Sequence, residues 1–288
     1  MANASIGVIG GSGLYAMEGL ADVAEVALDT PYGAPSDSFV LGTLAGRRVA
    51  FLPRHGRGHR LSPSEVPNLA NIHAFKQLGV HALISVSAVG SLRDDYAPGH
   101  VVIPDQLFDR TKGIRPFTFF NQGVVAHVAF DKPFCQALSA HLLDAASRAG
   151  ATVHQGGTLV VMEGPQFSTK AESEENRRRG HALIGMTALP EAKLAREAEI
   201  AYATLATVTD YDVWHPDHDA VSVEAVMAVL HANVALSQRI VREAVALIGD
   251  DFRSTAHTAL ANAIVTDRAR IPAETKARLE LIAGKYLS

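Results

Sequence analysis

The segment Arg54-His55-Gly56-Arg57 concentrates hydrogen-bond donors directly after the apolar run Val49–Leu52. A guanidinium and an imidazole together bind phosphate through charge-assisted hydrogen bonds, so this loop predicts an anion site. Two other interpretations stay open. His55 and His59 are suitably spaced for a metal site only in a helix, which the glycines on both sides of Arg57 disfavour. The segment is also consistent with a basic loop exposed to solvent.

Two carboxylates follow a long apolar run. Thr209-Asp210-Tyr211-Asp212 comes directly after Ala201–Val208. The pKa of a carboxyl group rises in an apolar pocket, and the group then serves as a proton donor in catalysis. Asp210 and Asp212 are therefore candidates for general acid catalysis. An aspartate that caps a turn and a metal site of the Asp-x-Asp type are the alternatives.

Small residues follow two other apolar runs. Gly10-Gly11-Ser12-Gly13 can turn tightly and present backbone N–H groups to an anion. It does not fit the dinucleotide fingerprint, because Ala16 stands where a third glycine is needed. Ser87-Ala88-Val89-Gly90 offers a hydroxyl and close approach to the backbone. An ordinary turn and an ordinary strand end are the alternatives for these two segments.

The segment Glu163-Gly164-Pro165-Gln166-Phe167-Ser168 places an acid before a Gly-Pro turn and an aromatic ring after it. Phe167 is suited to stacking on a planar ligand, although phenylalanine more often packs in a core.

Short apolar runs rich in Val and Ile predict the buried strands Ile6–Ile9, Val49–Leu52, Ala82–Val86, His100–Ile103, Thr158–Met162 and Ala201–Val208. Helical patterns cover Asn68–Leu78, Phe134–Arg148, Lys170–Arg179, Glu191–Glu199 and Val223–Ile248. This alternation predicts a single α/β domain with a mixed, largely parallel central sheet flanked by helices. Ligands of such sheets bind beyond the carboxyl ends of the strands, where we expect the polar segments to meet.

The composition changes after Ile248. Residues 249–254 are typical of a linker, and Thr255–Asp267 and Pro272–Tyr286 predict two amphipathic helices, with Pro272 in the first turn of the second. We therefore expect one domain over residues 1–248 and a C-terminal helical extension over residues 249–288.

Composition limits the classes of function. The 288 residues are 48% hydrophobic and 19% charged, which predicts a compact globular chain. The formal net charge of -4 argues against sequence-independent binding to nucleic acid or anionic lipid. We expect a small-molecule ligand and no membrane span, since no apolar run reaches about 20 residues. The absence of a signal-peptide pattern and the lone Cys135 favour the cytoplasm.

Together these segments resemble the trimeric branch of the purine nucleoside phosphorylase family, over about Ile6 to Ile248. The likeness also includes Thr30-Pro31-Tyr32-Gly33-Ala34-Pro35-Ser36-Asp37, Asn68-Leu69-Ala70-Asn71-Ile72, Asp105-Gln106-Leu107-Phe108-Asp109-Arg110-Thr111 and Met186-Thr187-Ala188-Leu189-Pro190-Glu191.

The resemblance implies a role for individual residues. The residues implied to bind phosphate are Ser12, Arg54, His55, Ser87, Ala88 through its backbone, and Thr187. Met186 would lie under the ribose, and the purine would be surrounded by Phe167, Ser168, Asp210 and Asp212. Ser12 and Ser87 stand where the family often has threonine, a change that keeps the hydroxyl.

The implied reaction is cleavage of the C1'–N9 bond of a purine nucleoside by inorganic phosphate. Positive charge gathers on the ribose and negative charge on the departing purine, so each needs a partner of opposite charge. Phosphate, oriented by Arg54 and His55, would stabilise the sugar and then attack C1', while Asp210 protonates N7 and Asp212 assists. Phosphate is then a co-substrate, and we expect no metal and no organic cofactor.

Two features of the sequence concern the substrate. Carboxylates suit the 6-amino donor of adenine, whereas an amide suits hypoxanthine. The resemblance places the 5'-pocket on the next helix, at Val223, Val226 and Met227, whose apolar side chains suit a methylthio group and leave a 5'-hydroxyl unpaired. We therefore expect 5'-methylthioadenosine as the substrate. Methylthioinosine or another purine nucleoside is the nearest alternative, and a nucleotide-binding protein of this fold without turnover is the other.

The resemblance also implies an oligomer. In the family a neighbouring subunit completes the pocket, and the corresponding residue is His127. A homotrimer is expected, with a hexamer left open.

Overall fold

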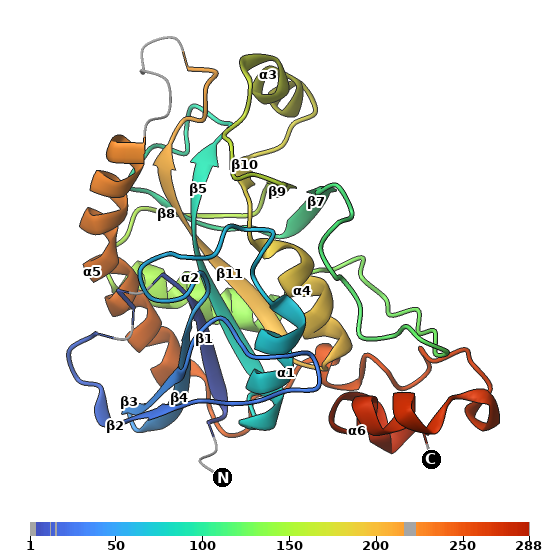
Figure 1. Cartoon of the computed structure of the whole chain (residues 1–288). Coiled ribbons are helices and arrows are strands. Elements are labelled where there is room, and N and C mark those ends of the chain that lie inside the picture. The colour runs from blue at the N-terminus through green and yellow to red at the C-terminus, as the bar shows by residue number, and fades with distance from the viewer. Residues whose placement is uncertain (1–3, 12, 15, 216–222, 288) are drawn as a thin grey trace.

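A computed structural model describes residues 4–11, 13–14, 16–215 and 223–287, apart from the side chains at 223–226, 228 and 230–232. Its centre is one mixed, largely parallel sheet with helices on both faces (Figure 1). This confirms the predicted fold class. All predicted strands, and all helices predicted before residue 249, are present; Thr158–Met162 has the predicted ends, and the ends of the others are shifted.

The strands are β1 (Ile6–Gly10), β2 (Ala21–Val26), β3 (Phe39–Leu44), β4 (Arg47–Pro53), β5 (Ala82–Ser91), β6 (Val101–Ile103), β7 (Gln106–Arg110), β8 (Val153–Gln155), β9 (Thr158–Met162), β10 (Leu183–Gly185) and β11 (Ala201–Asp210). The helices are α1 (Asn68–Gln77), α2 (Gln136–Arg148), α3 (Lys170–Arg178), α4 (Ala188–Glu197), α5 (Val223–Leu247) and α6 (Ala273–Leu287). The sheet runs in the order β2-β3-β4-β1-β5-β10-β9-β7. β11 joins it on β5 and continues it through β6 to β8.

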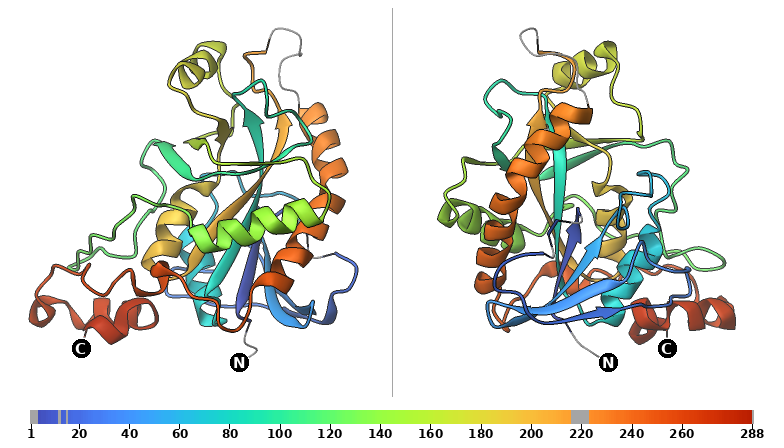
Figure 2. Two further views of the ribbon diagram at one scale, coloured as in Figure 1. Left: turned by 180° about the vertical axis from the view of Figure 1, so that it is seen from behind. Right: turned by 60° about the vertical axis from the view of Figure 1, so that its left-hand side comes forward.

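Helices cover both faces of the central strands, which explains why those strands are apolar on both sides. Neighbouring residues of a strand point to opposite faces, so Leu83 and Ile84 of β5 enter different layers. Ile84 belongs to the core built with α2 and α5, and Leu83 to the core built with α1 and α4. In Figure 2, left, α2 lies across the front of the sheet with α5 beside it.

The strand β5 exchanges its partner along one edge. Its first residues, Ala82–Ser85, pair in parallel with β1, whereas Gly90 and Ser91 pair antiparallel with β10. On the other edge of β5, β11 pairs with it from Ala82 to Gly90, alongside the stretches that pair with β1 and β10. Among the described residues, 86–89 therefore have no strand partner on the first edge. We call this stretch the β5 gap.

The predicted ends of two strands were wrong. The polar segment 87–90 lies inside β5 and not beyond it, because β11 and β10 continue the ladder past Val86. Likewise Asp210 is the last residue of β11 and pairs with Gly90 after an irregularity in the register. The polar groups thus lie along the strands themselves.

The C-terminal extension differs from the prediction in its first half. Only Thr255–Thr258 form a short 3₁₀ helix, where a helix to Asp267 was predicted. The chain instead extends to pair with an earlier segment: Val265 N–H donates to the Val125 carbonyl at 3.0 Å, and His127 N–H donates to the Ala263 carbonyl at 2.8 Å. The second predicted helix is confirmed as α6, which packs beside α1 (Figure 1). The division of the chain at residue 248 stays a prediction.

Glu199 fastens the extension to the core. Its buried carboxylate accepts hydrogen bonds from Leu260 N–H at 3.1 Å and from the Tyr286 hydroxyl at 2.7 Å. Lys285 forms an ion pair with it at 2.7 Å, but the lysine side chain is 60% exposed. Most of the stabilisation is therefore expected from the buried Leu260 N–H and the half-buried Tyr286 hydroxyl.

Replacing Glu199 by alanine leaves the buried Leu260 N–H and the half-buried Tyr286 hydroxyl without this acceptor. An unsatisfied buried donor such as the Leu260 N–H costs about 1–3 kcal/mol, so we expect a lower free energy of unfolding in urea and faster proteolysis of residues 250–287. Lys285→Ala is the control, since loss of an exposed ion pair typically costs less than about 1 kcal/mol. Equal stability of Glu199→Ala and the wild type would contradict this account.

Candidate active site

Arg54 lies at the first end of the β5 gap. Its guanidinium donates from Nη1 to the Val86 carbonyl at 3.1 Å and from Nη2 to the Ser85 hydroxyl at 2.7 Å. Its backbone N–H donates to the Gly10 carbonyl at 2.9 Å, which brings the glycine-rich loop after β1 beside it. Ser12, the predicted phosphate ligand of that loop, lies outside the described residues.

A buried carboxylate holds the Arg54 guanidinium. Glu191 accepts from Nε at 2.8 Å and from Nη2 at 3.0 Å, and both side chains are almost inaccessible to solvent. Burial opposes the charge of Arg54, but Glu191 prevails and raises the pKa of the guanidinium. The predicted cation is thus present, paired with an acid that the sequence analysis did not assign to the site.

The backbone of Ala88 faces the gap. In a strand the N–H and C=O of alternate residues point to the same edge. The Val86 carbonyl points to the gap, and Leu92 N–H on the same edge donates to the Ala182 carbonyl. Ala88 lies an even number of residues from both Val86 and Leu92, so its N–H points to the same edge as theirs. The residue is exposed, although it belongs to a central strand. Its N–H therefore faces the gap, where none of the described strands pairs with it.

Three hydroxyl groups lie close to the Arg54 guanidinium and the β5 gap. Ser87 Oγ lies 3.3 Å from Thr187 Oγ1 and 3.4 Å from Ser85 Oγ, which itself accepts from Arg54. The structure thus brings together Arg54, Ser87, Ala88 and Thr187, four of the residues predicted to bind phosphate.

His55 follows Arg54 and is neutral at physiological pH. Burial, together with the charge of Arg54, lowers the pKa of the imidazole to about 4. Its Nδ1 lies 2.8 Å from the Leu61 carbonyl, which can only accept, so Nδ1 carries the proton. Nε2 is then a hydrogen-bond acceptor. His59 stacks on the ring at 4.2 Å, and no cluster suited to a metal occurs in the described part of the chain.

The two predicted carboxylates lie together at the end of β11. Asp210 accepts from the Thr209 hydroxyl at 2.7 Å and from Asp212 N–H at 2.8 Å. Burial, with a contribution from Asp210, raises the pKa of the Asp212 carboxyl against the opposing influence of nearby serine hydroxyls. Asp212 Oδ2 is buried and makes no hydrogen bond of normal geometry.

Gly90 allows the carboxylate of Asp210 to lie against β5. A Cβ atom at Gly90 would be 2.8 Å from Asp210 Oδ1 and 3.0 Å from an Ile184 methyl group. Any larger residue at this position must displace one of them. The glycine of the predicted segment thus makes room for the acid.

Residues predicted to face the purine and ribose follow β9 and β10. Phe167 is 41% exposed, whereas Ser168 is buried and its hydroxyl points to Met162 Sδ at 3.7 Å. Met186 packs over Gly164: a Cβ there would be 2.5 Å from Met186 Sδ. The φ of Gly164, +67°, is also unfavourable for other residues.

Arg115 joins the segments that carry these side chains. It donates to the Met186 carbonyl at 2.7 Å, to the Leu189 carbonyl at 2.8 Å and to the Glu163 carboxylate at 2.7 Å. Since Arg115 is buried, these bonds fix the positions of the loops after β9 and β10.

The remaining predicted residues lie on the segment before α2 and on α5. His127 is exposed, and its segment pairs with the C-terminal extension. Met227 is 40% exposed on α5. The side chains of Val223 and Val226 lie outside the described residues.

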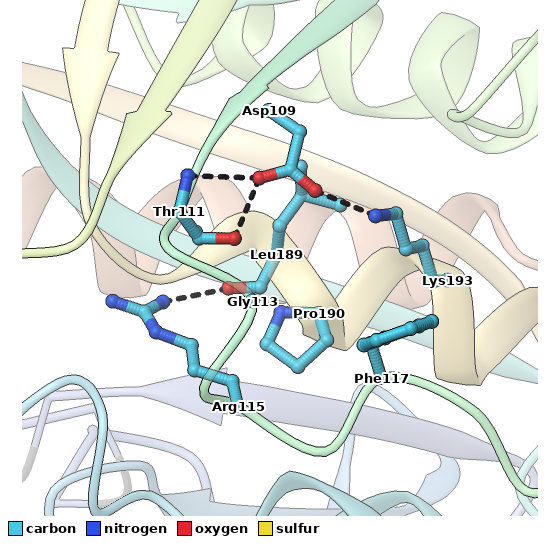
Figure 3. A pocket seen from close by; sticks show the side chains of 8 residues that line it. All are labelled: Asp109, Thr111, Gly113, Arg115, Phe117, Leu189, Pro190 and Lys193. Atoms are coloured by element: carbon cyan, nitrogen blue, oxygen red, sulfur yellow. Dashed lines mark hydrogen bonds and ion pairs between the residues drawn. The ribbon is translucent and has the colours of Figure 1, made fainter.

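A separate cavity of about 230 Å³ lies between the loop after β7 and α4 (Figure 3). Lys193 and Asp109 form an ion pair across it at 2.6 Å, and Arg115 and Phe117 also line it. None of the residues predicted to bind phosphate or purine lines this cavity, and its charged groups are already paired. We assign no function to it.

The chain belongs to the Phosphorylase superfamily, whose sequence profile matches residues 5–246. An S-methyl-5'-thioadenosine phosphorylase of Chloroflexus aurantiacus is 75% identical over 288 residues and covers 100% of both chains. The enzyme of the same name from Geobacter sulfurreducens is 59% identical, with 98% of this chain and 99% of the relative covered.

Solved structures agree with these relatives. A crystal structure of methylthioadenosine phosphorylase from an Antarctic soil metagenomic library is similar with a TM-score of 0.94 and 51% identity, covering 98% of this chain and 99% of the other. Methylthioadenosine phosphorylase from Schistosoma mansoni in complex with adenine is similar with a TM-score of 0.82 and 33% identity, covering 98% of both chains.

The lowered pKa of His55 predicts a pH dependence of stability. The unfolded imidazole binds a proton below about pH 6.5, whereas the folded one does so only near pH 4, so this residue makes stability fall as the pH decreases through that window. We expect His55→Gln to lose less stability between pH 7 and pH 4.5 than the wild type does. The measurement is urea unfolding at both pH values, and an equal loss in the two proteins would contradict the prediction.

Proposed function

We propose that this chain catalyses the phosphorolysis of 5'-methylthioadenosine to adenine and 5-methylthioribose 1-phosphate. High identity to relatives named for this activity, over the full chain, supports the reaction. One observation on the site carries the proposal: the β5 gap and the Asp210 carboxylate lie at neighbouring positions of β5. The Ala88 N–H faces the gap, and the carboxylate reaches from β11 on the other edge to lie over Gly90, two residues further along the strand. Two residues of a strand span about 7 Å, which accommodates a ribose between a phosphate and a purine.

The phosphate end of the site acts through hydrogen bonds. In this proposal Arg54, Ser87, Ala88 N–H and Thr187 donate to phosphate, with Ser12 completing the group. His55, whose Nε2 makes no hydrogen bond with the described residues, accepts the hydrogen that phosphate carries near neutral pH. Phosphate held in this way stabilises the positive charge that develops on the ribose and attacks C1' as the C1'–N9 bond breaks.

The purine end supplies a proton. Asp210 donates to N7 as negative charge gathers on the leaving base, and Asp212, whose pKa is raised by burial, assists through hydrogen bonds around the edge of the base. Phe167 stacks on the base and Ser168 contacts its edge. Met186, which Gly164 and Arg115 hold in place, lies under the ribose. The reaction needs no metal and no organic cofactor in this mechanism.

We also propose a homotrimer in which His127 of a neighbouring subunit closes the 5'-pocket formed by Val223, Val226 and Met227. Two exposed apolar residues on the same long segment, Ile114 at 68% and Phe117 at 51%, support burial of that segment by another copy. A hexamer stays open. We place the enzyme in the cytoplasm because of its lone cysteine; separately, no described helix is long and apolar enough to cross a membrane.

The test of the proposed function compares three nucleosides, methylthioadenosine, adenosine and methylthioinosine, each with and without inorganic phosphate. We expect release of free base only when phosphate is present, and the highest kcat/KM for methylthioadenosine. Base release without phosphate would exclude phosphorolysis. A higher kcat/KM for methylthioinosine would exclude the proposed preference for adenine.

Asp210→Asn should fold and lose most of its turnover of methylthioadenosine, because an amide cannot give N7 an acidic proton. General acid catalysis is typically worth about 10²–10⁴-fold, and kcat should fall within that range. Asp105→Asn, which changes an exposed carboxylate that accepts from Gly157 N–H at 3.0 Å, is the control. Wild-type kcat in folded Asp210→Asn would remove the acid from the mechanism.

A further inference from the structure

We propose that Glu191 is the positioning residue of the phosphate site: it fixes Arg54 so that one N–H of the guanidinium is left for the co-substrate. The inference rests on the proposed function, because it concerns how the same phosphate is bound. Glu191 of α4 would act through Arg54 and would not touch the phosphate itself.

The contacts of Arg54 account for nearly all of its donors. A guanidinium has five N–H groups. Nε donates to Glu191, and Nη2 is surrounded by Glu191, the Ser85 hydroxyl and, at 3.3 Å, the Ile9 carbonyl. Nη1 donates one hydrogen to the Val86 carbonyl. The second hydrogen of Nη1 has no acceptor among the described residues, and the Val86 carbonyl beside it belongs to the β5 gap.

The geometry of the Glu191–Arg54 pair, in addition to its charge, fixes the orientation of the guanidinium. The two carboxylate oxygens of Glu191 match the Nε and Nη2 donors of the fork, so rotation of the guanidinium about its own axis breaks both bonds. The pair is buried, so water cannot replace either bond. Arg54 is thus held in one orientation before phosphate arrives, which lowers the ordering that binding requires.

Tyr202 fixes Glu191 in turn. Its hydroxyl donates to Glu191 Oε1 at 2.8 Å from the neighbouring strand β11. Burial, with the charge of Glu191, raises the pKa of Tyr202 well above its usual value, so the hydroxyl keeps its proton and remains a donor. Arg54 directly follows β4, while Glu191 belongs to α4 and Tyr202 to β11, so together the three residues tie the phosphate site to three elements.

If Glu191 had a simpler role, neutralising it would change the affinity for phosphate in the opposite direction. If the acid only offset the charge of Arg54, its neutralisation would leave a stronger cation at the gap and tighten phosphate binding. If it positions Arg54, the same change weakens phosphate binding, because a glutamine amide cannot accept from both donors of the fork. The direction of the change in the phosphate KM therefore separates the two roles.

The experiment measures KM for inorganic phosphate and for methylthioadenosine in the full-length chain. We expect Glu191→Gln to raise the phosphate KM about tenfold or more, the usual effect of losing a hydrogen bond to a charged group, with the nucleoside KM within about twofold. Glu191→Asp keeps the negative charge, but its side chain is one methylene shorter and cannot reach both donors of Arg54. We therefore expect its phosphate KM to stay above the wild-type value. A lower or unchanged phosphate KM in Glu191→Gln, or full rescue by Glu191→Asp, overturns the proposal.

Two further variants keep the test decisive if Glu191→Gln does not fold. Tyr202→Phe removes only the hydroxyl that orients Glu191 and should raise the phosphate KM about threefold, a fraction of one hydrogen bond. Glu197→Gln is the control, a buried acid on the same helix that accepts from Phe119 N–H at 2.7 Å and makes no contact with Arg54. It should lose stability but keep the wild-type phosphate KM. An unchanged phosphate KM in folded Tyr202→Phe, or an equal rise in Glu197→Gln, overturns the positioning role.

The wild-type enzyme separates this inference from the proposed function. If it releases base without phosphate, the proposed function fails and the variants have no phosphate KM to compare. If it requires phosphate and the variants bind phosphate as it does, only the role of Glu191 fails.

Discussion

The exchange of partners along one edge of β5 is the constraint on which the site depends. A central strand of a covered sheet normally has both edges satisfied by neighbouring strands. Here β1 stops at Gly10 and β10 begins to pair only at Gly90, so a short stretch of backbone stays available between them. Arg54 satisfies the Val86 carbonyl, the first acceptor of that stretch, and the Ala88 N–H stays without a strand partner on this edge among the described residues. The polar chemistry is thus built into the middle of the sheet, where the surrounding strands hold it rigidly.

This arrangement also determines the charge of the site. Arg54 is neutralised by Glu191, and His55 carries no charge near neutral pH because its pKa is lowered to about 4. An anion therefore meets directed donors and not an excess of positive charge. In the function proposed above, such a site would recognise phosphate by its hydrogen-bonding pattern and still release a sugar phosphate, because the attraction falls when the geometry changes.

Much of this could be predicted from the sequence, because the central strands are apolar on both faces and the polar segments interrupt them abruptly. Other features gave no such signal. The strands β2 and β7 were missed since most of their side chains are exposed, and β8 and β10 have only three residues each. The strand β3 was also missed, although most of its side chains are buried. The end of β5 was placed too early because Ser87 and Gly90 are poor strand formers in isolation, while pairing with β11 and β10 decides the outcome. Glu191 looked like any acid near the start of a helix, and only the position of Arg54 across the fold makes it part of the site.

The β5 gap also bears on how the sheet avoids self-association. An open strand edge is ordinarily a template on which a strand of another molecule can pair. Residues 86–89 are bounded at one end by β1 and at the other by β10, and the Arg54 guanidinium occupies the first carbonyl. An incoming strand would find too few consecutive donors and acceptors to form a ladder. The same stretch of backbone can therefore stay open to a ligand the size of phosphate and closed to intermolecular β-pairing.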